Sequence, residues 1–519
     1  MEPRTRRDFL CEVGKGMLTA SVGAALASDL GLSAALAEGV EKPLAFGRLE
    51  PLVDLMQERS AEQMLPLVVD RLAHGTELRE VVAAAALANA RTFGGEDYIG
   101  FHAFMALMPA YEMSKESHSD RKALPVLKVL YRSTNQIQTK GGRNAEVLHH
   151  VDALSAPSST TGREALRDAS RHQQVDRAEG LFAGMAARSA SDAFNDLQAL
   201  VQDDTDVHRV VMAYRAWDLL SLTGKEHAHT TLRQSVRYCV TSEKNRIARG
   251  ASEPGIRSVL PQVLDQYHLT ERSLGARDAD DTWIASFCDT LLNSNPAQAA
   301  DAVGAALAEG FSLNAIGEAL SLAATQQVLR DPGRTVAYPG KPLGSVHGDS
   351  TGVHASDSMS AWRNIARVSQ PRNALAGLVV AGYHLAHGAG GRDWKHLLPY
   401  PLSEHRIQVT VQDAPGLLRE TDGAIRENNQ ALAAALVQRY GELGYAHRPV
   451  FDLLLRYATS EDGALHAEKY YKTVSDEFAR SRKSTRWQHV TALARVTASE
   501  YGRRADGYEQ ACRLLQVTG

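Results

Sequence analysis

The sequence predicts an all-α protein. Aromatic residues make up only 6% of the 519 residues while alanine is abundant, which favours closely packed helices over a sandwich or barrel. Apolar residues recur at three- and four-residue spacing along most of the chain after Pro43. Related helical patterns recur along the chain, so we expect divergent multi-helix repeats that form an α/α array or toroid.

The N-terminal segment has the pattern of an export signal. Residues 5–10 read TRRDFL, which matches the twin-arginine pattern, and a mildly apolar run from Val13 to Leu36 follows. An A-x-A site ends this run, so we expect the twin-arginine export machinery as a partner and cleavage after Ala37. The mature protein is then expected to be periplasmic or extracellular. Charged residues interrupt the run, and no later segment has ~20 uninterrupted apolar residues, so we expect no permanent membrane span.

Because its helical patterns recur, we expect the mature chain to consist of four units. An alanine-rich run (Val81 to Ala90) predicts a tightly packed inner helix, and 405–413 alternates like one short strand of a small hairpin at most. We therefore expect a signal peptide at 1–37 followed by helical repeat units at 38–155, 156–290, 291–400 and 401–519.

A His-Ala pair stands at the expected start of a helix in each unit. The histidines are His102, His227, His354 and His466. Neutral imidazole is a usual ligand of zinc, copper and non-haem iron, and such sites collect ligands from several helices. If the units surround a centre, equivalent positions converge, and the four side chains become candidate ligands of a transition metal (iron, copper or zinc). The alternative is that they cap or pack, because repeats also recur where packing recurs.

Acidic residues accompany three of these histidines at a fixed spacing. Asp97, Asp349 and Glu461 each stand five places before the histidine of their unit. We expect them to act as further metal ligands or to orient the imidazoles. Glu226 directly precedes His227, so the second unit departs from the spacing.

Tyrosines recur on the helices that follow the histidines. The segments LPVLKVLY and LPQVLDQY end at Tyr131 and Tyr267, and ALAGLVVAGY ends at Tyr383. Near a metal centre a phenol can donate a hydrogen bond or take part in redox chemistry. We therefore expect these three tyrosines to be candidate catalytic residues.

The composition and the absence of known motifs argue against several classes of function. The net charge is −4 with acidic and basic residues interleaved, so we expect no nucleic-acid partner. The four cysteines form no CxxC, which makes zinc-ribbon, iron-sulfur and c-type haem sites poor candidates. No GxSxG, HExxH, Walker loop or Rossmann fingerprint occurs in a strand-to-helix context.

The segment GFHAFMALMPAYEM (residues 100–113), with the later histidine-bearing helices, resembles questin oxidase-like proteins. These are all-helical oxygenases with repeated histidines, so the resemblance implies an oxidative, metal-assisted reaction. The similarity covers short pieces only, and this chain lacks the clustered asparagine-histidine run of that family. The chain as a whole is more similar to uncharacterised exported helical proteins.

Three hypotheses follow for the function. The first is a metal-dependent oxidoreductase that acts on a small-molecule substrate at a histidine-lined site. The second is a non-enzymatic helical scaffold that binds a partner and whose histidines are packed. The third is a helical hydrolase or lyase with a His/Tyr acid-base pair, whose activity would survive chelation.

Overall fold

The computed structural model describes residues 42–390, 392 and 394–518. Within these residues every regular element is a helix, and the only β contacts are three isolated bridges. The prediction of an all-α protein is confirmed. Ala45–Gly519 forms one compact unit, and the arrangement below is that of this unit.

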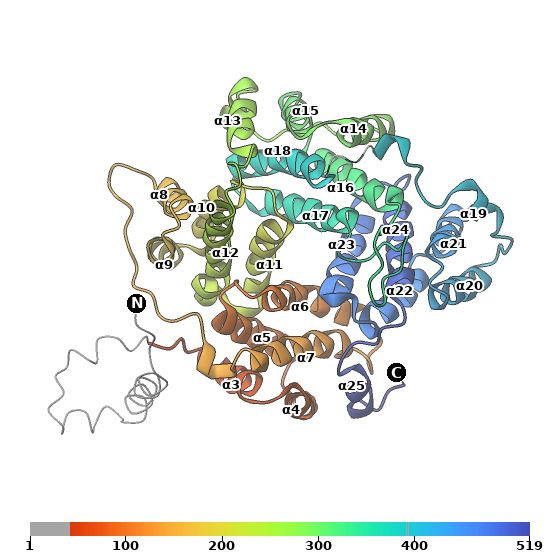
Figure 1. Cartoon of the computed structure of the whole chain (residues 1–519), viewed down its shortest axis with the longest axis horizontal. Coiled ribbons are helices and arrows are strands. Elements are labelled where there is room, and N and C mark those ends of the chain that lie inside the picture. The colour runs from red at the N-terminus through yellow and green to blue at the C-terminus, as the bar shows by residue number, and fades with distance from the viewer. Residues whose placement is uncertain (1–41, 391, 393, 519) are drawn as a thin grey trace, which may run out of the picture. The chain divides into compact units, whose positions relative to one another are not determined.

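The α-helices follow one another with short connections over most of the chain (Figure 1). In chain order they are α3 (Glu50–Glu58), α4 (Ala61–Ala73), α5 (Leu78–Phe93), α6 (Tyr98–Glu116), α7 (Leu124–Thr139), α8 (Gly162–Arg171), α9 (Val175–Arg188), α10 (Ala190–Val201), α11 (Val207–Thr223), α12 (Ala228–Ala248), α13 (Ile256–Gln266), α14 (Asp281–Asn293), α15 (Pro296–Ala308), α16 (Leu313–Arg330), α17 (Thr351–Val368), α18 (Pro371–Gly388), α19 (Ser403–Ile407), α20 (Ala414–Arg426), α21 (Gln430–Glu442), α22 (Arg448–Ser460), α23 (His466–Arg480), α24 (Arg486–Glu500) and α25 (Tyr508–Leu514).

Four inner helices define the centre of this unit. α6 packs on α11, α11 on α17, α17 on α23, and α23 on α6, so the four close a ring around a common centre (Figure 1). Further helices cover each of them from outside, including α5 against α6, α12 against α11, α16 against α17 and α24 against α23. Side chains on the inner faces of four helices that are distant in sequence therefore meet.

Side-chain caps fix where the inner helices begin. Asp97 accepts a hydrogen bond from the Gly100 amide (2.7 Å) at the start of α6, and Ser350 accepts one from the Val353 amide at the start of α17. Asp206 accepts one from the His208 amide (3.1 Å) at the start of α11. Such a cap satisfies an amide that has no partner within its helix, which contributes about 1 kcal/mol. The caps thereby set the position of each first turn.

Alanine allows α5 to pack closely behind α6. Every residue from Val81 to Phe93 is buried, and α5 ends at Gly94 in the left-handed conformation. Short side chains bring the helix axes close together and cost little side-chain entropy. The alanine-rich run is therefore an inner packing element, as the sequence predicts.

Buried ion pairs tie α23 to its neighbours. Lys128 on α7 reaches Glu468 on α23 at 2.7 Å, and its ammonium also donates to the Ala458 carbonyl at 2.8 Å. Arg363 on α17 pairs with Glu477 on α23, and both side chains are almost fully buried. Removing one partner would leave an uncompensated buried charge, so these pairs fix how α23 sits against α7 and α17.

The prediction of a short strand at 405–413 is wrong. The first residues of this segment complete the short helix α19, where the Leu402 amide donates to Nδ1 of His405 (3.1 Å), and no described residue pairs with the remainder as a strand. Alternating polarity alone does not form a strand where no neighbouring strand takes up its backbone hydrogen bonds.

Two further predictions remain predictions, and the described helices bear on a third. The export signal lies in residues 1–37, outside the described residues. The boundaries of the four repeat units stay a prediction, because Ala45–Gly519 does not divide further into compact units. None of the described helices combines the length and the apolar content that crossing a bilayer takes.

Candidate histidine site

Four imidazoles meet at the centre of the inner ring. His102 lies on α6, His208 on α11, His354 on α17 and His466 on α23, each in the first two turns of its helix. Nε2 of His102 lies 3.3 Å from Nε2 of His208, and Nε2 of His354 lies 3.3 Å from Nε2 of His466. We call these four residues the histidine cluster.

The two pairs of the histidine cluster also contact each other. The ring centroids of His102 and His466 are 5.1 Å apart, and those of His208 and His354 are 6.0 Å apart. Within the pairs the centroids lie 4.8 Å and 5.4 Å apart. The four rings therefore form one contiguous group to which each inner helix contributes one side chain.

Hydrogen bonds at Nδ1 orient the first pair. Nδ1 of His102 lies 2.7 Å from the carbonyl oxygen of Tyr98, which can only accept, so this nitrogen carries the proton. Nδ1 of His208 lies 3.3 Å from a carboxylate oxygen of Asp206 and hydrogen-bonds to it. In both residues Nδ1 faces an acceptor, the Tyr98 carbonyl or the Asp206 carboxylate, and Nε2 faces the other ring of the pair.

Asp206 is held as a carboxylate. Burial opposes its ionisation, but hydrogen bonds from His208 and from the Tyr238 hydroxyl outweigh burial and keep the pKa of Asp206 below its ordinary value. Burial, and next the charge of Asp206 and the hydrogen bond to it, raise the pKa of the Tyr238 phenol, so it remains a donor. A carboxylate behind a histidine fixes the tautomer and makes Nε2 a better ligand.

A strained turn places His466. The preceding turn Gly463–Leu465 puts Ala464 and Leu465 at positive φ (48° and 65°), which is uncommon for residues with a side chain. Gly348, just before α17, lies against this histidine so closely that a Cβ there would overlap the His466 Cβ. The amide of Gly348 donates to Glu500 on α24 at 2.7 Å. Local strain and a glycine contact together hold the ring at the centre.

A buried lysine and a buried aspartate stand one helical turn below the cluster. Lys469 follows His466 by three residues on α23, and Asp357 follows His354 by three residues on α17, so each lies on the same helix face as its histidine. Both are buried, and Asp357 accepts a hydrogen bond from Thr473 (2.9 Å). Burial lowers the pKa of Lys469 to about 8 although Asp357 opposes this, so the side chain is mostly charged at pH 7 but gives up its proton more readily than an ordinary lysine.

Three of the four imidazoles, those of His102, His354 and His466, are neutral near pH 7. Burial, and next the positive charge of Lys469, lower the pKa of His102 to about 2 and that of His354 to about 4. The same causes hold the pKa of His466 well below its ordinary value. Neutral imidazole is the form that binds a metal ion.

The cluster lies close to the surface on the side of Tyr98. This side chain is 59% exposed, and its ring centroid is 4.3 Å from that of the buried His102. Phe101 packs against the other ring of the pair in a tilted arrangement, with its centroid 5.0 Å from that of His208. An oxidisable aromatic side chain therefore stands between solvent and the imidazoles.

The structure brings three of the four predicted histidines together and places the fourth elsewhere. His102, His354 and His466 are in the cluster. His227 ends a short 3-10 turn before α12, is partly exposed, and packs edge-on against Phe46 at 5.6 Å. His208 on α11 takes the place that the sequence pattern gave to His227.

The three predicted acidic partners have other contacts. Asp97 caps α6 and accepts from Gln136 (2.9 Å), and Asp349 pairs with Lys341 (3.1 Å) as well as Arg334. Glu461 accepts from Arg504 (3.1 Å). The carboxylate that contacts a clustered imidazole is that of Asp206.

The three predicted tyrosines lie on outer elements. Tyr131 donates to Glu62 (2.8 Å), Tyr267 donates to Asp301 (3.0 Å), and Tyr383 stacks on His387 with centroids 5.9 Å apart. The tyrosines that contact clustered histidines are Tyr98 and Tyr238.

His208 was missed because it lacks the His-Ala pair. The sequence does carry one signal, since Asp206 stands two residues before it at a helix start. Such an aspartate can cap the helix and hydrogen-bond to the histidine at the same time, so an Asp-x-His sequence at a helix start is the signal that indicates His208.

The four rings stand as two pairs rather than around one point. Within the part of the chain that the structure describes, no group of three or more His, Cys, Asp or Glu side chains has its donor atoms gathered as a bound metal would hold them. A cavity of about 700 Å³ elsewhere in the protein shares no lining residue with the cluster.

Comparison of the chain with protein families, curated proteins and solved structures gives no match.

Proposed function

We propose that the histidine cluster binds one transition-metal ion and that the protein is a metal-dependent oxidoreductase. The observation that carries the proposal is the approach of two inward-facing Nε2 atoms, those of His102 and His208, to 3.3 Å. The proposal includes the arrangement of four divergent helical units around the ring, each contributing one imidazole.

The first pair can hold a positive charge between its rings. Nδ1 of each residue faces an acceptor, and the two Nε2 atoms lie within hydrogen-bond distance at 3.3 Å, where a proton or a metal ion can join them. Protonation of His102 is disfavoured, since burial and Lys469 lower its pKa to about 2. A metal ion supplies the charge without a proton.

The spacing of both pairs fits a shared metal ion. Nitrogens bound at about 2.0–2.1 Å in tetrahedral geometry lie about 3.3 Å apart. Nε2 atoms are 3.3 Å apart in the His102–His208 pair and in the His354–His466 pair. A small movement of the two pairs toward each other would give four nitrogen ligands.

An all-imidazole site favours particular metals. Imidazole suits zinc, copper, iron and nickel, whereas magnesium, calcium and manganese prefer oxygen ligands. Iron or copper would supply one-electron chemistry at this site when bound. Support for a redox role comes from Tyr98, whose exposed ring lies beside His102.

The protein's own groups have defined tasks in this proposal. Asp206 fixes the tautomer of His208, and the Tyr98 carbonyl fixes that of His102. Lys469, with a pKa near 8, can accept a proton from a substrate or offer a further nitrogen ligand. Burial of the rings keeps water from competing for the Nε2 atoms.

Metal analysis of the full chain, folded in the cytoplasm, tests the proposal. The wild-type protein is expected to hold about one iron or copper ion per chain, and His208→Ala and His354→Ala are expected to lose it. His227→Ala is the matched control and should keep the metal, because His227 lies outside the cluster. Sub-stoichiometric metal after growth with excess iron, copper or zinc would count against the proposal.

A scaffold with packed histidines is the second candidate. The observation that favours it is the separation of the rings into two pairs. In that case His354→Ala would change stability but not metal content. If the cluster holds only zinc and the protein hydrolyses substrates, the protein is a zinc hydrolase and the proposed redox function is wrong.

We propose further that the protein works in the periplasm or outside the cell. The support is the TRRDFL pattern and the A-x-A site in the first 37 residues. Cell fractionation of the wild type and of an Arg6→Lys, Arg7→Lys variant tests this. Retention of the variant in the cytoplasm is the expected result.

A further inference from the structure

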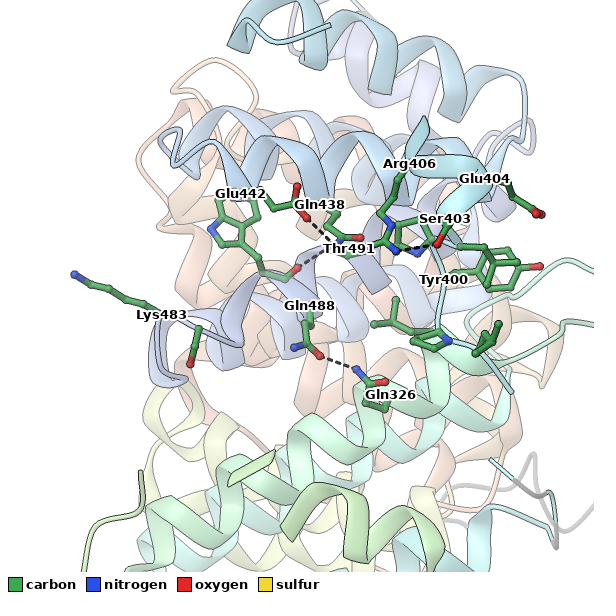
Figure 2. Close-up of a pocket in the computed structure, with 18 residues that line it drawn as sticks. Gln326, Tyr400, Ser403, Glu404, Arg406, Gln438, Glu442, Lys483, Gln488 and Thr491 are labelled. Carbon is green, nitrogen blue, oxygen red and sulfur yellow. Dashed lines mark hydrogen bonds between the residues drawn. The ribbon is translucent and has the colours of Figure 1, made fainter. Parts of the chain in front are cut away.

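A cavity with a mixed polar and apolar lining lies apart from the histidine cluster (Figure 2). Its lining comes from α16, α21, α24, residues 398–406 and residues 483–484. The cavity volume is about 700 Å³, within the range of about 300–1,000 Å³ of small-molecule sites. Nothing in the proposed chemistry of the cluster uses this cavity.

Three glutamine side chains supply hydrogen-bonding groups to the cavity. Gln326 donates to Oε1 of Gln488 at 2.6 Å, and Gln438 donates to Oε1 of Glu442 at 2.9 Å (Figure 2). Among the described residues no side-chain hydrogen bond uses the amide N–H groups of Gln488 or Oε1 of Gln438. The lining therefore offers a ligand a donor on Gln488 and an acceptor on Gln438.

The charged groups of the cavity balance. Glu404 and Glu442 are acidic, and Arg406 and Lys483 are basic. Arg406 donates to Ser403 (3.2 Å), and it retains further N–H groups. A lining with no net charge does not select a phosphate, a metal ion or a polycation.

Aromatic side chains complete the lining. Trp487 on α24 is partly exposed and lies against Gly441 on α21, where any Cβ would overlap the indole. Phe478 packs edge-on to the same indole, with centroids 5.4 Å apart. The ring of Tyr400 lies 3.9 Å from the guanidinium carbon of the buried Arg495. Both aromatic side chains are thus held in place before a ligand arrives.

We propose that this cavity binds a neutral polyhydroxylated ligand of the carbohydrate class. Each hydroxyl both donates and accepts, so a sugar matches a lining in which amide N–H, amide oxygen, carboxylate and guanidinium groups alternate. The apolar face of a sugar ring matches a fixed indole such as that of Trp487. The balance of charges favours a ligand without charge of its own.

The test is calorimetric titration of the full chain with glucose, maltotriose, cellotriose and N-acetylchitotriose as probes. At least one sugar is expected to saturate a single site with a Kd of about 10 μM to 1 mM. Gln488→Ala is expected to weaken that binding about fivefold to tenfold, because one amide contact is lost. Trp487→Phe should also weaken sugar binding while it keeps an aromatic ring in the packing. If either variant fails to fold, Gln438→Ala replaces it and should likewise weaken sugar binding.

The control is Gln262→Ala, which removes an exposed glutamine on α13 outside the cavity and should leave sugar binding unchanged. The proposal is overturned if none of the four sugars binds. It is also overturned if binding is the same in the wild type and in the Gln488→Ala and Trp487→Phe variants, or if the zwitterionic tripeptide Gly-Gly-Gly occupies the site and sugars do not. Since the cavity shares no residue with the histidine cluster, these outcomes are independent of metal binding.

Discussion

His354 and His466 bring their Nε2 atoms to 3.3 Å although 112 residues separate them in sequence. One lies near the start of α17 and the other starts α23, and these helices are adjacent in the inner ring. The contact therefore exists only when both helices are formed and packed. Four predictions follow from this dependence of the cluster on the fold.

Metal should stabilise the folded chain. A ligand that binds only the folded state adds about 2.7 kcal/mol when its free concentration is 100 times its Kd. We expect iron(II) or copper(II) to raise the melting temperature of the metal-free protein, measured by circular dichroism, and a chelator to reverse the rise. The His208→Ala, His354→Ala double variant should show no metal-dependent shift. An equal shift in that variant would mean that metal binds elsewhere.

Asp206→Asn should lower metal affinity about 10- to 100-fold, because the carboxylate fixes and polarises the His208 ring. Competition with a chromophoric chelator measures this affinity. Asp97→Asn is the matched control, since Asp97 caps its helix without contacting the cluster. Equal losses of affinity in the two variants would contradict the role of Asp206.

The metal-free protein should lose stability as the pH falls from about 6.5 to about 4. The pKa of His354 is about 4 in the folded chain and 6.5 when unperturbed, so the unfolded state binds more protons in this window. The contribution of His354 to the free energy of unfolding is fully present above pH 6.5 and is lost as the pH falls toward the pKa of the folded state. Each such histidine contributes a slope of about 1.4 kcal/mol per pH unit.

Urea unfolding at several pH values measures that slope. His354→Gln should lower the slope by about 1.4 kcal/mol per pH unit, the contribution of one proton. His74→Gln should leave the slope unchanged, because His74 is an exposed side chain at the end of α4. A slope that is the same in the wild type and in His354→Gln would show that this ring is protonated in the folded chain.

Gly348→Ala should destabilise the protein by about 1–3 kcal/mol and weaken metal binding, because the new Cβ overlaps His466. Chemical unfolding and the chelator competition measure the two effects. Gly423→Ala on α20 is the control: nothing lies within 4 Å of its Cβ position, so it should be neutral or stabilising. A Gly348→Ala variant with wild-type metal affinity would show that the position of His466 is not critical.

The sequence predicts the helices well because each buries one apolar face. It does not show which helix of a unit faces the centre. Of the two successive helices α11 and α12, α11 is the inner one, so His208 joins the cluster while His227, at the start of α12, lies outside it. The apolar residues recur at helical spacing on both α11 and α12. Which of the two helices faces the centre depends on contacts with helices that are distant in sequence.

The acidic and tyrosine predictions differ from the structure for a related reason. Asp97 stands at a helix start, where a carboxylate satisfies free amides. Tyr131 and Tyr267 face Glu62 and Asp301 on neighbouring helices, and no local pattern reveals such partners. Recurrence along the chain identifies equivalent positions but not what lies opposite them.

The closed ring of inner helices also sets the order of events in the life of the protein. Its first imidazole comes from α6 and its last from α23, so a nascent chain cannot assemble the histidine cluster until α23 has been made, late in synthesis. If the cluster binds an ion and the protein is exported, as we propose, the ion is captured late in folding and the chain is folded before it crosses the membrane.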